Sequence, residues 1–413
     1  MNVTRRNFLK SLAMLPAGYA LLPQGLLRAI MAPPGAGPRN LVLVDLRGGN
    51  DGLNMVVPYG LAGGSYYGEF RQSLAVPLSA VLPLAGGIGL NPGLLALKAH
   101  FHAGRLAIAQ GVSYPEPSFS HEVAQRIWQT GDPANAAPDG WLGRFLAQLG
   151  VPSSPSAVAV SGTLELLVTG SGGFVPNFQH LQDFSFPSDD EHAGDKANRR
   201  AAYAAITAGL AGSGGHLATM ADTSTGILEL IDLFATVPPF TSVGTYPAGS
   251  SLSSGLKLTM RLLHADIGMR YFHIPWGGFD THADQELDGF HSKRMALLGD
   301  ALHAFWQDLG SAGLADDTLV VVFSEFGRTV HENGSGGTDH GSVAPVLVFG
   351  NAAVGGLATP HPSMDPADLT ESGELPMTTD LRDVFGTLVA DWLGGDAAAI
   401  FPGHALTTLP LLV

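Results

Sequence analysis

The most constraining stretch of the sequence is a pair of apolar runs joined by a glycine-rich polar loop, between Asp317 and Gly350. The runs 318–323 and 343–349 are rich in β-branched residues and too short for core helices, so we predict two buried strands. The loop between them carries acidic, basic and imidazole side chains. Its glycines allow sharp turns and a close approach of the backbone to a ligand.

The polar residues of this loop have two interpretations. Glu325, Arg328, Asp339 and His340 are typical of a metal or catalytic site at the ends of neighbouring strands in an α/β sheet. The same residues also fit a solvated loop in which Asp-His-Gly is only turn chemistry. We favour the functional interpretation because similar residue sets recur after other predicted strands.

Alternation of strands and helices along the chain predicts an α/β fold with a mostly parallel sheet covered on both faces. The predicted strands are 40–46, 106–110, 156–160 and 269–274, in addition to the two above. The predicted helices are 92–102, 120–130, 141–149, 256–264, 287–309 and 379–392. We expect one domain over residues 33–413, with a loop-rich insertion at about 170–254 that carries helical patches near 196–210 and 227–235.

Composition limits the classes of partner and of metal site. Hydrophobic residues make up 45% of the 413 residues and charged residues 14%, which indicates a large buried core. The net charge of −15 argues against nucleic acid or an anionic membrane as a partner. Because the chain has no cysteine, it forms no disulfide, and any metal must be held by oxygen and imidazole ligands.

The first residues resemble a twin-arginine export signal. Arg5 and Arg6 precede Phe-Leu-Lys and a modest apolar stretch at 11–22. A short membrane anchor is the alternative, but Pro16 and Gly18 interrupt a stretch already too short to span a bilayer. We therefore expect residues 1–32 to be an export signal recognised by the twin-arginine machinery. The mature protein would be periplasmic or secreted, without stable membrane insertion, and could load its metal before export.

Two more predicted strands are followed by candidate metal ligands. Asp51 follows the strand 40–46 in a glycine-rich turn, where Asp45 within the strand is a rival. Asp280 and His282 follow the strand 269–274 in the same way. Since the carboxyl ends of parallel strands share one edge of a sheet, we expect these side chains to converge there with those of the 325–340 loop.

Ser120 and His121 stand at the predicted start of a helix. Taken alone, Ser120 is more typical of a helix cap. As a nucleophile it would sit at a helix N-terminus, where backbone N–H groups favour an anion. His121 could instead carry a metal or a proton.

Carboxylates and imidazoles from several strands suit one or two divalent cations such as Zn, Mg, Mn or Ca. Two metals a few ångströms apart can clamp the attacking and leaving oxygens of a phosphoryl or sulfuryl transfer. A serine close to them can act as the nucleophile. Arg328 or Arg47 can hold the oxyanion of the substrate as a bidentate fork.

The chain resembles the bacterial domain-of-unknown-function family 1501 (DUF1501), which looks like a distant branch of the alkaline phosphatase-like superfamily. The matching pieces follow the family's order over nearly all of the mature chain: Gly48-Gly49-Asn50-Asp51-Gly52-Leu53-Asn54, Ser120-His121, Gly140-Trp141-Leu142-Gly143-Arg144, Gly277-Gly278-Phe279-Asp280-Thr281-His282, Ser324-Glu325-Phe326-Gly327-Arg328-Thr329 and Gly337-Thr338-Asp339-His340-Gly341.

The resemblance implies a doubly wound sheet and a two-metal site. It implies that Asp51 is the metal aspartate after the first strand and that Ser120 is the nucleophile. It further implies metal-ligand roles for Asp280, His282 and His340. Glu325 falls where the superfamily usually has an Asp-His pair, and this departure puts one of the two metal positions in doubt.

Two functions remain in competition. The first is an exported metal-dependent hydrolase of phosphate or sulfate esters, with a two-metal site and a serine nucleophile. The second is a non-catalytic exported protein that keeps the fold and binds a ligand or a partner. An enzyme requires nucleophile, metal ligands and an oxyanion clamp in one pocket, so the geometry of the site is the discriminating observation.

Replacing both Arg5 and Arg6 with lysine tests the export signal. We expect the variant to accumulate in the cytoplasm, because the twin-arginine pair is what the export machinery recognises. Cell fractionation with immunoblotting of both compartments measures the distribution. Unchanged delivery of the variant out of the cytoplasm would show that the segment is not a twin-arginine signal.

Overall fold

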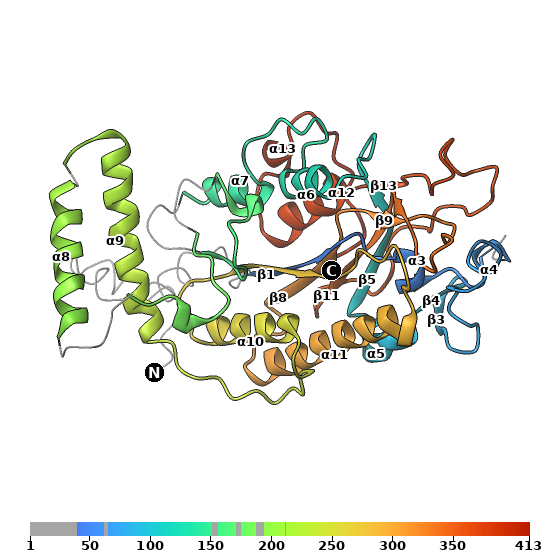
Figure 1. Ribbon diagram of the computed structural model, residues 1–413, viewed down its shortest axis with the longest axis horizontal. Coiled ribbons are helices and arrows are strands. Elements are labelled where there is room, and N and C mark those ends of the chain that lie inside the picture. Colours follow the sequence, from blue (N-terminus) through green and yellow to red (C-terminus); the bar gives the residue numbers. More distant parts are fainter. Residues whose placement is uncertain (1–38, 62–64, 151–155, 171–174, 187–193, 211) are drawn as a thin grey trace, which may run out of the picture.

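A mostly parallel β-sheet forms the middle layer of the protein in the computed structural model (Figure 1), which describes residues 39–61, 65–150, 156–170, 175–186, 194–210 and 212–413. The strand order is β12-β5-β11-β8-β1-β7-β6, and β13 also pairs with β5. The strands are β1 Asn40–Arg47, β5 Leu106–Ser113, β6 Ala157–Ala159, β7 Tyr271–Gly277, β8 Thr318–Phe323, β11 Ala344–Phe349, β12 Gly356–Leu357 and β13 Thr379–Asp380.

The predicted α/β fold with a doubly wound, mostly parallel sheet is confirmed. β1 pairs in parallel with both β7 and β8, and β6 pairs in parallel with β7. β11 runs antiparallel to both of its neighbours, β5 and β8. As a result, the loop that leaves the carboxyl end of β8 enters β11 at the same edge of the sheet.

Strand β1 lies in the centre of the sheet, and five of its eight residues are apolar and buried. Val42, Val44 and Leu46 pack into the core on one face, and Leu41 and Leu43 pack into the core on the other. A strand that is buried on both faces shows this continuous apolar pattern instead of polar-apolar alternation.

Helices cover both faces of the sheet (Figure 1). One face is covered by α5 Leu95–His102, α10 Ser251–His264 and α11 Phe290–Ser311. The other is covered by α6 His121–Thr130, α7 Trp141–Gln148, α12 Leu381–Thr387 and α13 Ala397–Ile400. Helices α5, α6, α7, α10 and α11 lie where helices were predicted, with starts that differ by up to five residues, whereas α13 was not predicted.

The last predicted helix begins later than expected. Thr379, the predicted cap, belongs with Asp380 to strand β13. The Asp380 carboxylate accepts a hydrogen bond from the Arg382 N–H and is the actual N-cap of α12. The main chain of Thr379 cannot start a helix because it is engaged in pairing with β5.

Two parts of the structure lie outside the main layers. Residues 52–90 form short helices α3 Gly52–Met55 and α4 Ser65–Phe70 and a small antiparallel sheet of β2 Val56–Val57, β4 Ile88–Leu90 and β3 Leu82–Ala85, none of which was predicted. The long helices α8 Asp195–Leu210 and α9 Gly215–Ala235 stand side by side at one end of the molecule (Figure 1). They fall within the predicted insertion at about 170–254.

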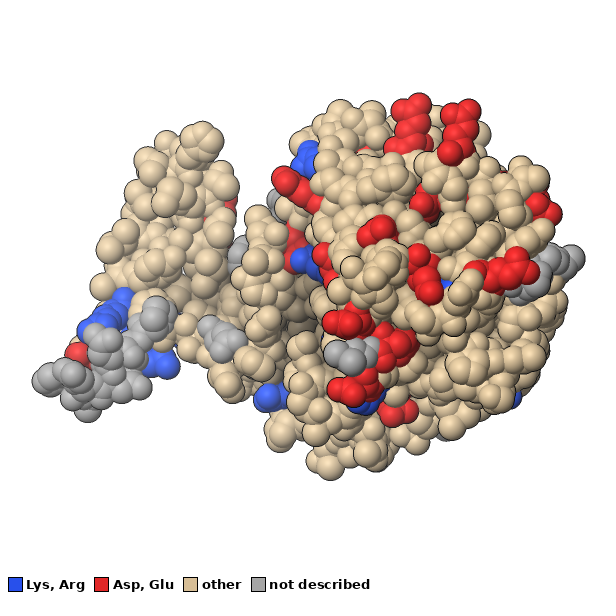
Figure 2. Space-filling view, turned by 45° about the vertical axis from the view of Figure 1, so that its right-hand side comes forward, with Lys and Arg blue, Asp and Glu red and all other residues tan. Residues whose placement is uncertain are grey.

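The export segment at 1–32 lies outside the described residues. Among the described helices, none combines the length and apolarity needed to cross a membrane. Acidic side chains outnumber basic ones over the face of the main body shown in Figure 2, in keeping with the net charge of −15.

Truncating Phe385 tests the aromatic core beneath α6 and α7. Phe385 is fully buried, with ring centroids 4.9 Å from Trp141 and 5.6 Å from Phe323. We expect Phe385→Ala to lower the free energy of unfolding by about 3–5 kcal/mol, because it leaves a cavity. Leu164→Ala, at a position 72% exposed, is the control and should change it by less than about 0.5 kcal/mol. Equal denaturant midpoints for the two variants would contradict this packing.

Candidate metal centre

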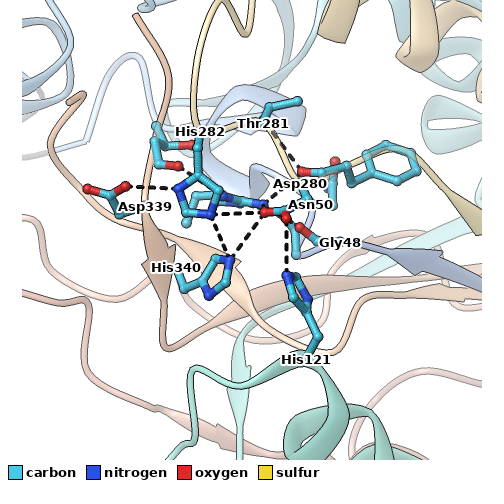
Figure 3. Close-up of polar contacts among 12 residues, drawn as sticks. Gly48, Asn50, His121, Asp280, Thr281, His282, Asp339 and His340 are labelled. Carbon is cyan, nitrogen blue, oxygen red and sulfur yellow. Dashed lines mark hydrogen bonds and ion pairs between the residues drawn. The ribbon is translucent and has the colours of Figure 1, made fainter. Parts of the chain in front are cut away.

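The carboxyl edge of the sheet gathers the loops that follow β1, β7 and β8 beside the start of helix α6. Asp280 follows β7 and lies at the centre of this group (Figure 3). His340 comes from the short hairpin of β9 Gly327–Arg328 and β10 His340–Gly341, which follows β8. His121 is the first residue of α6.

Three imidazoles surround the Asp280 carboxylate through their Nε2 atoms (Figure 3). The Nε2 atoms of His282 and His340 lie 3.0 and 3.2 Å from Oδ1 of Asp280. His121 Nε2 lies 3.4 Å from Oδ2 of the same carboxylate. About half of the Asp280 side chain is exposed, so the cluster is open to a ligand from solvent.

The other nitrogen of each ring is held by an oxygen acceptor. The Nδ1 contacts are 2.9 Å to Glu325 Oε1 for His121, 2.9 Å to Asp339 Oδ1 for His282, and 2.7 Å to the Phe119 carbonyl for His340. A carboxylate or a carbonyl can only accept, so in each ring Nδ1 carries the proton and donates. Nε2 of each ring is then the nitrogen left to face a metal ion on the Asp280 side; without a metal, Nε2 of His340 lies within hydrogen-bond distance of Asp280 Oδ1 and can donate to it.

This arrangement fits a metal ion. One ligand atom from each of His121, Asp280 and His340 lies within 4.8 Å of the other two. The Nε2 atom of His121 is buried yet makes no hydrogen bond. The Nε2 atoms of His282 and His340 are 3.0 Å apart, and two lone pairs at that distance repel each other unless a cation or a proton lies between them. Ligating histidines held at Nδ1 by carboxylates or carbonyls are the usual surroundings of a bound metal.

The ionised carboxylates of the site are stabilised by their neighbours. Partial burial alone would raise the pKa of Asp280, but hydrogen bonds from Arg328 and His340 lower it to about 2. Burial would also raise the pKa of Glu325, but hydrogen bonds from His121 and from the Gly48 N–H hold that pKa below its usual value. The hydrogen bond with Glu325 in turn raises the pKa of His121.

Arg328 joins the loops of the site and has little freedom to bind a substrate. Its guanidinium is fully buried and donates to the carbonyls of Gly49, Thr338 and Phe279 at 2.6–3.0 Å, and to that of Gly48. It also donates to Asp280 Oδ1 at 2.7 Å. Arg328, expected as an oxyanion clamp, therefore lies at the site as a residue that positions Asp280.

Asp51 lies at the same edge but makes a separate buried ion pair. Both of its carboxylate oxygens accept from Arg71 Nη1, at 2.8 and 2.7 Å, and both side chains are 0% exposed. Gln285 Nε2 donates to Oδ2 at 2.5 Å, and the Asn54 N–H donates to Oδ1. Opposing the effect of burial, the Arg71 charge lowers the pKa of Asp51. The structure thus does not bring Asp51 into the group around Asp280.

Ser120 lies next to the cluster along the chain and is exposed. It occupies the N-cap position of α6, but its side chain accepts no capping hydrogen bond. The carbonyl of the preceding Phe119 binds His340, and the following His121 faces Asp280, so the Ser120 backbone borders the cluster on both sides. The capping interpretation therefore lacks its hydrogen bond.

The nine predicted site residues thus occupy three settings. Asp280, His282, His340 and His121 face one another. Glu325, Asp339 and Arg328 hold members of that group from behind, and Ser120 borders it. Asp51 lies apart.

Sequence analysis missed Arg71, and also Gln125, which donates to Glu325 at 3.2 Å. Gln125 lies four residues after His121 on α6, and this spacing was the available signal.

Comparison with solved structures finds distant similarity. The C-terminal periplasmic domain of EcEptC from Escherichia coli, in complex with Zn, is 13% identical with a TM-score of 0.42, covering 90% of this chain and 89% of that one. The lipoteichoic acid synthase LtaP from Listeria monocytogenes is 9% identical with a TM-score of 0.40, covering 89% and 74%. The PsFucS1 sulfatase from Pseudoalteromonas sp. is 12% identical with a TM-score of 0.37, covering 88% and 69%.

No curated protein matches the sequence. A family model does match, over residues 105–400, which include the start of α6, the β7 loop and the β9–β10 hairpin that build the cluster. The predicted family is confirmed: the chain belongs to the family described as "Protein of unknown function (DUF1501)".

Proposed function

We propose that this protein is an exported, metal-dependent hydrolase of phosphate or sulfate esters. One observation supports this most directly: three imidazole Nε2 atoms converge on a single carboxylate that is open to solvent. The ligands would be Asp280, His121 and His340, with His282 as a fourth. The reaction class follows from the family resemblance found in the sequence.

An imidazole-rich donor set favours zinc or another transition metal over calcium or magnesium, which prefer oxygen ligands. When bound, a divalent cation there supplies Lewis acidity toward an ester oxygen. Glu325 and Asp339 keep the Nδ1 protons of His121 and His282 in place, so that Nε2 remains a ligand atom. Arg328 fixes the Asp280 carboxylate in the orientation that faces the histidines.

Ser120 is the proposed nucleophile. Its hydroxyl is exposed, is not used for capping, and stands at the N-terminus of α6, where N–H groups favour an anion. Attack by Oγ forms a bond to phosphorus or sulfur while the bond to the alcohol oxygen breaks; the serine proton leaves to solvent, and the alcohol oxygen takes up a proton from solvent. Water then attacks the serine ester, which restores the Ser120 hydroxyl and releases the phosphate or sulfate product.

Elemental analysis of the purified mature protein tests the metal site. We expect bound divalent metal in the wild type and its loss in His340→Ala, since the variant removes one ligand of the cluster. His216→Ala, at an exposed histidine of α9, is the matched control and should keep the metal. Full metal content in His340→Ala would rule out this ligand set. Metal binding without turnover of phosphate, phosphodiester or sulfate esters would favour the alternative, a non-catalytic binding protein.

Ser120→Ala separates a nucleophile from a helix cap. For a nucleophile, ester hydrolysis should fall by roughly a thousandfold or more while bound metal is retained. Since Ser120 makes no capping bond, the free energy of unfolding should change by less than about 0.5 kcal/mol.

Ser250→Ala is the matched control, because Ser250 caps α10 through a bond from the Ser253 N–H. It should cost about 1 kcal/mol of stability and leave turnover unchanged. His121→Ala, assayed in parallel, shows whether the neighbouring ring carries the effect. Wild-type turnover in Ser120→Ala would eliminate the covalent route.

A further inference from the structure

The carboxyl edge of the sheet offers a second carboxylate, Asp51, to which the family resemblance assigns a metal-ligand role in a two-metal site. The residues around it do not fit a metal ion. Arg71 Nη1 contacts both carboxylate oxygens at 2.7–2.8 Å, so a guanidinium already occupies the position in which a cation would balance Asp51. Gln285 and the Asn54 N–H take further lone pairs of the same carboxylate.

Arg71 is also fixed by groups other than Asp51. Its Nε donates to the Val330 carbonyl at 3.0 Å, and its Nη2 donates to the Thr329 carbonyl at 2.7 Å. Nη1 donates to Asn54 Oδ1 at 2.9 Å as well. The guanidinium is fully buried, and displacing it would leave these carbonyls without a partner and an unpaired charge in the interior. A metal ion therefore does not displace Arg71.

The charge around the remaining metal position is then small. Asp280, Glu325 and Asp339 contribute three negative charges, Arg328 contributes one positive charge, and the histidines are neutral ligands. One divalent cation brings the sum to about zero. The protein as a whole carries −15, and acidic residues predominate on the face in Figure 2, so the long-range field repels highly charged anions.

From this geometry we infer that the site binds one divalent cation and accepts monoanionic esters, namely phosphodiesters or sulfate monoesters, in preference to dianionic phosphate monoesters. The inference rests on the proposed function and names its substrate class. A phosphate monoester is largely dianionic above its second pKa of about 6. A site of near-zero charge attracts such a dianion less strongly than a two-metal site would.

Metal stoichiometry is the first arm of the test and does not depend on turnover. Chelator-treated wild-type protein is titrated with zinc chloride by calorimetry, and the bound metal is counted per chain after gel filtration. We expect one equivalent, with none retained by His340→Ala and one retained by the His216→Ala control. Two equivalents retained by the wild type would overturn the inference.

The Asp51→Asn variant tests whether Asp51 is a metal ligand. The amide keeps the size of the side chain and can still accept from Arg71 and the Asn54 N–H, and circular dichroism verifies that the variant is folded. One equivalent of zinc in the folded variant supports the inference, and loss of the metal overturns it. If Asp51→Asn does not fold, the wild-type stoichiometry alone decides.

The second arm compares three esters with one leaving group: p-nitrophenyl phosphate, bis-p-nitrophenyl phosphate and p-nitrophenyl sulfate, at pH 8 with one equivalent of zinc. We expect kcat/KM for the diester or the sulfate to exceed that for the monoester by at least tenfold. A preference for the monoester overturns the inference and leaves the proposed function intact. Absence of turnover on all three esters overturns the proposed function and the inference with it.

Discussion

The buried guanidinium of Arg328 is the interaction on which the candidate site depends. It donates to backbone carbonyls in the loop after β1, the loop after β7 and the hairpin after β8, and also to Asp280. A buried guanidinium must find an acceptor for each of its N–H groups, because an unpaired charge in the interior is costly. Loops that are distant in sequence are therefore held in one relative position. Asp280 can face both His121 and His340 only while the loops keep that position.

The histidines owe their orientation to a second set of acceptors. Glu325 is buried under the cluster and Asp339 is exposed at its rim, yet each accepts from an Nδ1 atom. The carbonyl of Phe119 does the same for His340. Two charged acceptors and one neutral acceptor give the same outcome, a ring whose Nε2 atom faces Asp280. The acceptors thus determine which nitrogen of each ring a metal ion would contact.

Much of the fold could be predicted from local pattern, because buried strands such as 40–46 and 318–323 carry continuous β-branched runs. The gathering of Asp280 and His340 followed from their places after such strands. Other features depend on tertiary contacts that no local pattern records. The segment that carries Arg71 has no clear periodicity, and its pairing with Asp51 is decided only when the chain folds. Likewise, α12 begins later than predicted because Thr379 pairs with β5.

The buried pair of Asp51 and Arg71 still supports the site, but as part of its framework. Gln285 donates to Asp51 through Nε2, while its Oε1 accepts from the hydroxyls of Thr281 and Thr338 at 3.0 and 2.7 Å. Thr281 directly follows Asp280 in the chain, and Thr338 directly precedes Asp339. Arg71 binds the carbonyl of Thr329, whose N–H bonds the Asp339 carbonyl. The hydrogen bonds that begin at Asp51 and Arg71 therefore hold the backbone on either side of the candidate metal ligands.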